Sequence, residues 1–209
     1  MIEIDDVSVR AGDVELLPPT SARVGPGEAL VVRGENGAGK STLLKVLAGR
    51  LAPTSGAVRL HGAPVHQGDP AFRRRAASLV GLPPTAPDLT VHDHVLLVAR
   101  TWWADAPAAA DAARDVLAEL GLEALRLRYP HELSSGQAQL VALALVLVRP
   151  SEVLLLDEPE QRLDAGRLDL VAGALERRRA RGAMLVVATH SDVLATGLGD
   201  RLLVLGAPR

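Results

Sequence analysis

The nine residues GENGAGKST, at positions 34–42, constrain what this chain can fold into more than any other stretch. An apolar run at 29–32 precedes them, and apolar residues at helical spacing follow over 42–48. The pattern G-x-x-x-x-G-K-S between a strand and a helix is that of a phosphate-binding loop. A chance glycine-rich turn ahead of a helix is the alternative interpretation, and the order of strand, loop and helix makes it the weaker one.

Each residue type in this loop has a physical role in holding phosphate. Glycine lets the backbone turn tightly, so that several N–H groups converge on phosphate oxygens, and the following helix adds the positive end of its dipole. Lys40 places a point charge on the outer phosphates, and the Ser41 hydroxyl is a ligand for Mg²⁺. The residues expected to hold the phosphates are Gly34, Glu35, Asn36, Gly37, Ala38, Gly39, Lys40, Ser41 and Thr42.

A second motif lies far along the chain, where the apolar stretch 153–156 ends in the adjacent carboxylates Asp157 and Glu158. A buried strand places Asp157 at its carboxyl end, where the ligand crevices of α/β proteins form. There Asp157 can hold Mg²⁺, and Glu158 can polarise an attacking water. Surface acids that cap an ordinary strand are the alternative, which the phosphate-loop motif upstream disfavours.

A third motif, LSSGQ at 133–137, lies between these two. Taken alone, Ser134 is a good N-cap for the apolar helix expected over 138–148. This purely structural interpretation would be preferred if the stretch stood by itself.

The composition excludes several classes of protein. The 209 residues are 48% hydrophobic and 23% charged, which is typical of a folded chain with a sizeable core. A net charge of −2 gives no reason to expect nucleic acid, and the absence of cysteine excludes a disulfide framework. We expect no signal peptide at the acidic start and no membrane span, because the longest apolar run, 140–148, is shorter than the about 20 residues needed.

The hydrophobic pattern predicts an α/β fold. A turn-rich stretch is expected over 18–28, a helix over 168–179, and a helical insertion over about 86–150, where alanine and leucine dominate. Strands that alternate with helices favour a parallel sheet. The expected strands are 2–9, 29–32, 58–61, 153–156 and 184–188.

Together, these motifs resemble the nucleotide-binding subunit of ABC transporters, whose signature LSGGQ lies between two nucleotide-binding motifs. Here GENGAGKST, LSSGQ and VLLLDEP follow in that order, with residues 161–164 in the place of the D-loop and His190 in the place of the switch histidine. The resemblance implies a P-loop NTPase core with a parallel sheet, an N-terminal antiparallel β subdomain and an inserted α-helical subdomain. It implies one domain over 1–209, with the core at about 1–85 and 151–209.

The same resemblance implies ATP and Mg²⁺ as cofactors and ATP hydrolysis as the activity. Glu158 and His190 are then catalytic, and Ser41 and Asp157 bind the metal. Two subunits, identical or different, associate head to tail, so that each ATP lies between residues 34–42 of one copy and the signature of the other. The residues implied on that second side are Ser134, Ser135, Gly136, Gln137 and Asp164.

Dimer opening and closing would be passed to separate transmembrane permease subunits, with this chain on the cytoplasmic face of the membrane. A soluble ABC ATPase in an assembly process and a weakly hydrolysing regulatory subunit are the alternative interpretations. Intact Glu158 and His190 favour hydrolysis over the regulatory alternative. The transported substrate and the direction of transport are not encoded in these motifs.

Three departures from the family pattern stand out. Ser135 replaces a signature glycine, and Ala11 stands where family members stack an aromatic residue on adenine. Family members also carry a glutamine ahead of a Leu-Thr-Val segment, where this chain has Pro84 or Thr85. Proline offers no side-chain acceptor and restricts the backbone, so we expect slow ATP hydrolysis by the isolated subunit.

Two kinds of rare side chain have structural interpretations. Trp102 and Trp103 lie in the helical segment, where core packing is favoured over an exposed surface for a partner. Of the six histidines, only His190 is expected in the site. The other five lack metal-ligand spacing and are interpreted as solvated or locally bonded: His61, His66, His92, His94 and His131.

Overall fold

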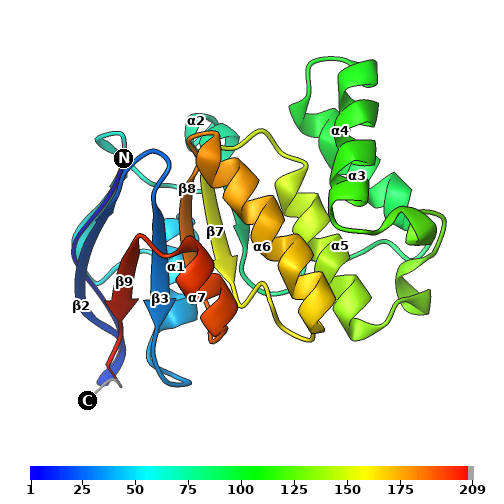
Figure 1. Ribbon diagram of the computed structural model, residues 1–209. Helices are drawn as coiled ribbons and strands as arrows, with labels where there is room; N and C mark the ends of the chain where they lie inside the picture. Colours follow the sequence, from blue (N-terminus) through cyan, green and yellow to red (C-terminus); the bar gives the residue numbers. More distant parts are fainter. Residues whose placement is uncertain (207–209) are drawn as a thin grey trace. The chain divides into compact units, whose positions relative to one another are not determined.

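The structure is a computed structural model that describes residues 1–206, and the chain divides into two compact units (Figure 1). The first comprises Met1–Val80, Ser151–Glu158 and the chain from Glu176 onward, and the second comprises Gly81–Pro150 and Pro159–Leu175. The sequence interpretation assigned residues 159–175 to the core. They lie instead with the helical unit, where the Gln139 side-chain amide donates to the Pro159 carbonyl at 3.3 Å.

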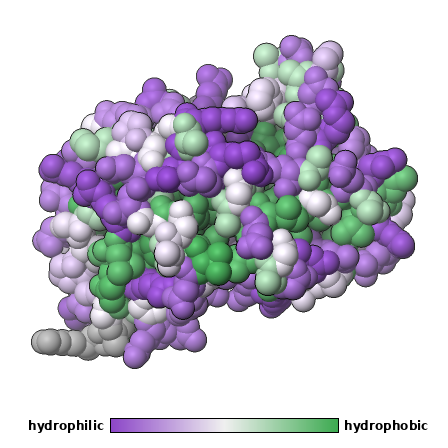
Figure 2. All heavy atoms as spheres, viewed as in Figure 1, coloured by the Kyte–Doolittle hydropathy of each residue, from purple (hydrophilic) through white to green (hydrophobic). Residues whose placement is uncertain are grey.

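A five-stranded sheet of the first unit has the order β6-β7-β8-β3-β9, with every pair parallel as expected. The three middle strands are almost entirely buried, which explains why they read as unbroken apolar runs. β9 exposes Leu202 and Val204, and Figure 2 shows apolar atoms at the surface over this strand. The strands are β3 Ala29–Arg33, β6 Ala76–Leu79, β7 Val153–Asp157, β8 Met184–Ala188 and β9 Arg201–Val204.

An antiparallel sheet of the same unit has the order β2-β1-β4-β5. The expected turn-rich stretch is wrong over its first part, because β2 continues through Pro18 and Pro19 to Val24. β2 lies at the edge of this sheet, and its register with β1 shifts near these prolines, so their missing N–H groups are tolerated. The strands are β1 Ile2–Ala11, β2 Val14–Val24, β4 Ser55–Leu60 and β5 Ala63–Pro64.

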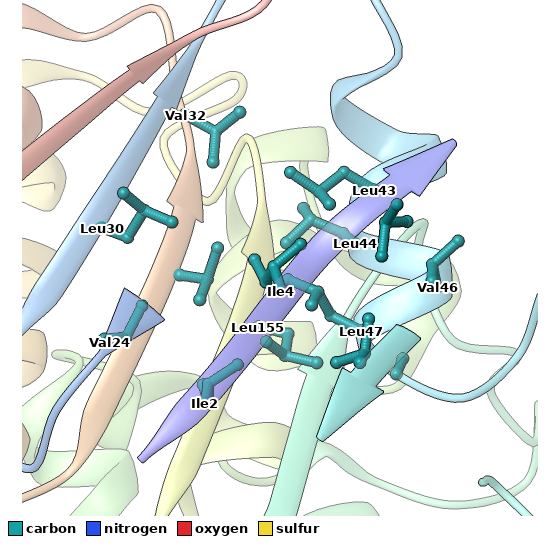
Figure 3. Close-up of a cluster of buried hydrophobic side chains, with 14 of the residues drawn as sticks. Ile2, Ile4, Val24, Leu30, Val32, Leu43, Leu44, Val46, Leu47 and Leu155 are labelled. Atoms are coloured by element: carbon teal, nitrogen blue, oxygen red, sulfur yellow. The ribbon is translucent and has the colours of Figure 1, made fainter. Parts of the chain in front are cut away.

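The core of the first unit lies between these two sheets and the helix that follows the glycine-rich loop. This helix, α1 Lys40–Leu47, buries Leu43, Leu44 and Leu47. Figure 3 shows these side chains against Ile4 of β1 and Leu155 of β7. The remaining helices of the unit are α2 Pro70–Arg75, α7 Asp192–Leu198 and the last turn of α6 Ala165–Ala180.

The second unit is helical, as the sequence predicts. Helix α5 Ser135–Leu147 is buried along most of its length and packs against α3 Val91–Trp102 and α4 Ala106–Glu119. No helix within residues 1–206 is both long enough and apolar enough to cross a membrane. The other elements are two short 3₁₀ helices, η1 Glu123–Leu125 and η2 Pro130–Glu132, and the start of α6.

The interpretation of the tryptophans as core residues is wrong. Trp103 is 36% exposed, and its indole N–H donates to the Val148 carbonyl at 2.8 Å. The Arg149 guanidinium lies 4.0 Å from the ring centroid of Trp102, a cation–π contact. Both rings therefore fasten the end of α3 to the end of α5, each through a polar group that sequence spacing does not reveal.

Asp200 joins the beginnings of β3 and β9 in the first unit. Its carboxylate accepts the Ala29 N–H at 2.9 Å and the Arg179 guanidinium at 2.9 Å. The hydrogen bond from the Ala29 N–H contributes most to holding the pKa of Asp200 below its usual range. Burial opposes this effect, and the Arg179 guanidinium adds to it. A carboxyl group whose folded-state pKa is lowered stabilises the fold above its unfolded pKa, and this stabilisation is lost as the pH falls through the folded-state pKa.

We predict that Asp200→Asn lowers the free energy of unfolding by roughly 1–2 kcal/mol at pH 7, a value reduced for its partial exposure. The difference from wild type should shrink as the pH falls below about 4, the unfolded pKa of aspartate. Urea unfolding at pH 7, 4 and 3 measures both. Asp111→Asn, which breaks an exposed 2.7 Å pair with Arg114, is the control and should change little. A pH-independent loss would contradict the electrostatic explanation.

Candidate nucleotide-binding site

Three neighbouring parallel strands bring distant motifs to one edge of the sheet. Asp157 of β7 pairs with Ala188 of β8, which also pairs with Val32 of β3. The carboxyl ends of these strands therefore lie side by side, and the glycine-rich loop, Asp157, Glu158 and His190 follow them directly. The sequence predicts these residues as parts of one site, and the first unit contains all of them.

The glycine-rich loop passes close to the backbone of β2 before α1 begins. Gly39 is the N-cap of α1 with φ of 95°, a conformation that favours glycine. A Cβ at this position would lie 2.6 Å from the Leu16 carbonyl oxygen and 3.2 Å from the Leu17 Cα. Gly39 is thus required both by its dihedral angle and by the space available, which explains one of the three glycines in the motif.

Lys40 is the buried cation of the loop, only 6% exposed. Its ammonium donates to the Gly34 carbonyl at 2.8 Å and the Glu35 carbonyl at 3.1 Å. These bonds hold the charge at the first turn of α1, where backbone N–H groups without helical acceptors also point. The arrangement concentrates positive potential in a small volume, which suits an anion with several oxygens such as a polyphosphate.

Glu158 leaves β7 through a sharp backbone turn, with φ of 46°. Its N–H donates to the Ala188 carbonyl at 2.8 Å, which fixes the turn against β8. The carboxylate Oε1 lies 3.6 Å from Nε2 of His190, and about a third of the Glu158 side chain is exposed. The Thr189 N–H, bonded to the Val32 carbonyl, anchors the residue before this histidine. An acid and an imidazole are therefore held together at the edge, both reachable by water.

Ser41 and Asp157 provide two oxygen donors. Two donors suit Mg²⁺ better than they suit a metal ion whose ligands all come from protein side chains. Helix α1, which carries Ser41, packs against β7, which ends at Asp157. Within residues 1–206 there is no group of three His, Cys, Asp or Glu side chains able to enclose a metal. Mg²⁺ commonly binds one or two protein oxygens and completes its coordination shell with phosphate oxygens and water. Ser41 and Asp157 match this pattern.

The signature residues and Asp164 lie together in the second unit. Ser134 caps α5 in a capping box with Gln137: the Ser134 N–H donates to the Gln137 side chain at 2.8 Å, and the Gln137 N–H donates to the Ser134 hydroxyl at 3.3 Å. A Cβ at Gly136 would lie 2.5 Å from the Arg162 carbonyl oxygen, so the D-loop backbone rests on the signature glycine. Asp164 accepts the Arg167 N–H at 2.9 Å at the start of α6.

The proline-rich loop at 82–87 has an anchor that sequence reasoning did not assign. His94 is 7% exposed; its Nε2 accepts the Ala86 N–H at 2.9 Å, while its Nδ1 lies 2.8 Å from the Thr90 carbonyl. The neutral ring with a proton on Nδ1 satisfies both bonds. In the sequence, the one signal for this role was that His94 lies one helical turn after Thr90, the N-cap of α3, within reach of its carbonyl.

The first unit offers no exposed aromatic ring to a nucleobase. Among the four Phe, Trp and Tyr residues of the chain, only Phe72 belongs to this unit, and it is buried in the core. At the β1–β2 hairpin Ala11 is exposed, and the Arg10 guanidinium donates to the Asp13 carbonyl at 3.3 Å. No other aromatic residue of this unit therefore replaces the adenine-stacking ring that family members carry at the position of Ala11.

Comparison with known proteins agrees with this geometry. The sequence profile described as ABC transporter matches residues 17–161. A putative ABC transporter ATP-binding protein of Streptomyces coelicolor is 38% identical over 204 residues, which cover 97% of this chain and 36% of the relative. The chain thus spans about a third of that relative's length. The lipoprotein-releasing system ATP-binding protein LolD of Geobacter metallireducens is 37% identical and is matched over 95% of this chain and 93% of its own length.

Solved structures show the same fold. The dimeric structure of a bacterial ABC transporter cassette superposes with a TM-score of 0.88 at 25% identity, covering 99% of this chain and 95% of the cassette. The mixed fold of parallel and antiparallel sheets with a helical unit is therefore that of ABC cassettes. From the matching profile, these relatives and the motifs gathered at the sheet edge, we conclude that this chain belongs to the ABC transporter family.

Proposed function

We propose that this chain binds ATP and hydrolyses it to power transport through separate membrane subunits. The observation that carries the proposal is the meeting, at one sheet edge, of a buried lysine in a glycine-rich loop with a paired acid and imidazole. Lys40 and the N-terminus of α1 supply positive charge for the phosphates. Glu158 and His190, 3.6 Å apart, supply groups that can activate water and contact the terminal phosphate.

The proposed hydrolytic step assigns a role to each of these groups. Glu158 accepts a proton from a water aimed at the terminal phosphate, and His190 orients that phosphate and stabilises its growing charge. Lys40 and the loop N–H groups hold the outer phosphates, so that attacking and leaving oxygens align. Mg²⁺ bound by Ser41 and Asp157 would neutralise charge on the phosphate oxygens.

A second copy or a related subunit completes the site. The capped N-terminus of α5, with Ser134–Gln137, carries backbone N–H groups and the positive end of a helix dipole, which suit a phosphate. In the proposed arrangement these donors, together with Asp164, close over the ATP held by residues 34–42 of the other subunit. Binding energy then closes the dimer, and hydrolysis reopens it.

The proposed place of action is the cytoplasmic face of a membrane, through partner permease subunits. The relative LolD, named for a lipoprotein-releasing system, supports a role in transport. We propose no nucleic-acid partner, in keeping with the net charge of −2. The cargo would be selected by the membrane subunits.

We predict that Lys40→Ala weakens Mg-ATP binding by about 100-fold, because the outer phosphates lose a charge-assisted contact from a buried ammonium. Titration calorimetry measures the affinity. The chain has two lysines, and Lys45→Ala on the same helix is the matched control that should bind normally. Equal affinity in the two variants would remove the phosphate-loop assignment.

Glu158→Gln should retain ATP binding and lose turnover by at least about 100-fold, because the amide cannot accept a proton from water. With Mg-ATP, the variant should accumulate as a dimer, which sedimentation or light scattering detects. Mg-ADP is the control, since it lacks the terminal phosphate. A variant that stays monomeric at high concentration with Mg-ATP argues against the two-subunit site.

The altered loop at 82–87 supports the second candidate function, a weakly hydrolysing regulatory subunit. We predict slow ATP turnover by the isolated wild-type chain. The exposed Pro84 and Thr85 have no side-chain amide at the place where family members carry glutamine. Substituting glutamine at Pro84, or at Thr85, should raise the rate of phosphate release.

Two controls separate the possible causes of slow turnover. Pro84→Ala relieves backbone stiffness without adding a side-chain amide, and Asp88→Gln adds a side-chain amide directly after the same loop. Turnover in wild type as fast as in glutamine-bearing relatives, with neither glutamine variant faster, would refute this explanation.

A further inference from the structure

Two helix N-termini of the second unit meet at one place, and an arginine side chain lies between them. α5 begins after Ser134, and α6 begins after Asp164. The Arg162 carbonyl would be 2.5 Å from a Cβ at Gly136, so the segment leading into α6 rests on the first turn of α5. The Nη1 atom of Arg167 would be 3.4 Å from that same Cβ. The Arg167 guanidinium therefore lies over the start of α5.

This position is electrostatically unfavourable for a cation on its own. The N-terminus of a helix carries a partial positive charge, and cations in the first turn are disfavoured. Arg167 lies in the first turn of α6 and beside the first turn of α5. The Asp164 carboxylate offsets part of this, because Oδ1 accepts the Arg167 N–H and Oδ2 lies 3.3 Å from Nη1. One carboxylate thus serves both a helix end and a guanidinium.

The guanidinium retains capacity for another anion. An arginine side chain has five N–H donors, and within residues 1–206 its one ion-pair partner is Asp164. About a third of the Arg167 side chain is exposed, and Asp164 is 62% exposed, so both can be reached from solvent. A planar guanidinium beside two helix N-termini matches the oxygens of a phosphate, which accepts paired N–H donors.

We infer that Arg167 contacts the terminal phosphate of the nucleotide held by the other copy of this chain. The inference rests on the proposed function, because Ser134–Gln137 must face that nucleotide across the dimer. Arg167 then adds a positive charge, on a partly exposed side chain, to the N–H donors of α5. The arriving phosphate compensates both helix ends and the guanidinium, so the contact strengthens the ATP-bound dimer and leaves nucleotide binding to the separate subunit unaffected.

The test uses the full chain carrying Glu158→Gln, in which Mg-ATP is not consumed. The dissociation constant of the dimer is measured by analytical ultracentrifugation over a range of protein concentrations and at two salt concentrations. Arg167→Gln should raise this constant by at least about tenfold and make it less dependent on salt. Arg167→Lys, which keeps the charge but not the fork, should recover part of the loss.

Two comparisons separate a phosphate contact from a structural role. Arg114 forms an exposed i,i+3 pair with Asp111 on α4, so Arg114→Gln is the matched control and should leave the dimer dissociation constant unchanged. Arg167→Gln should also bind Mg-ATP normally as a dilute monomer and melt at the parent temperature. A melting temperature that falls together with dimerisation, with no recovery in Arg167→Lys, would overturn the inference in favour of a structural role.

The remaining outcomes distinguish this inference from the proposed function. An Mg-ATP-dependent dimer in the Glu158→Gln chain with the same constant in Arg167→Gln overturns the inference and leaves the proposed function standing. Absence of any Mg-ATP-dependent dimer overturns both.

Discussion

The parallel hydrogen-bonded register of β7, β8 and β3 governs the position of every candidate catalytic group in the first unit. Asp157 is level with Ala188, and Ala188 is level with Val32, so the loops that follow start at the same height. Because these strands are buried on both faces, a slip of register would disrupt packing along their whole length as well as the site. The same strand register thus buries the strands and aligns the loops, and the positions of the candidate catalytic groups depend on that register.

The glycine-rich loop adds a second constraint at that edge. Gly39 must lack a side chain because the Leu16 carbonyl stands where a Cβ would be, and this contact ties the antiparallel sheet to the start of α1. Lys40 is then buried at the first helical turn and held by two carbonyls of its own loop. The ammonium is positioned by the backbone before any phosphate arrives, which reduces the ordering cost of binding one.

The motifs are divided between two compact units, and the boundary falls directly after Glu158. The proposed base thus ends one segment of the first unit, while the next residue, Pro159, begins a segment of the second. That segment carries Arg162, Asp164 and Arg167 and rests on the signature glycine Gly136. α6 then leads back into the first unit. Glu158 is therefore separated by only a few residues of chain from the groups proposed to close over the other subunit's nucleotide.

The sequence by itself determined the glycine-rich loop, the buried strands β3, β7 and β8, the cap of α5 and the family. These depend on residues near one another in the chain, whose spacing and apolar runs leave a readable pattern. The tertiary structure decided the rest, because its causes are partners distant in sequence. β2 continues through two prolines since it lies at a sheet edge, and Trp103 stays 36% exposed while its indole N–H bonds the Val148 carbonyl. His94 and Arg167 looked ordinary in the sequence, and only the fold brought one to a loop N–H and the other to a second helix N-terminus.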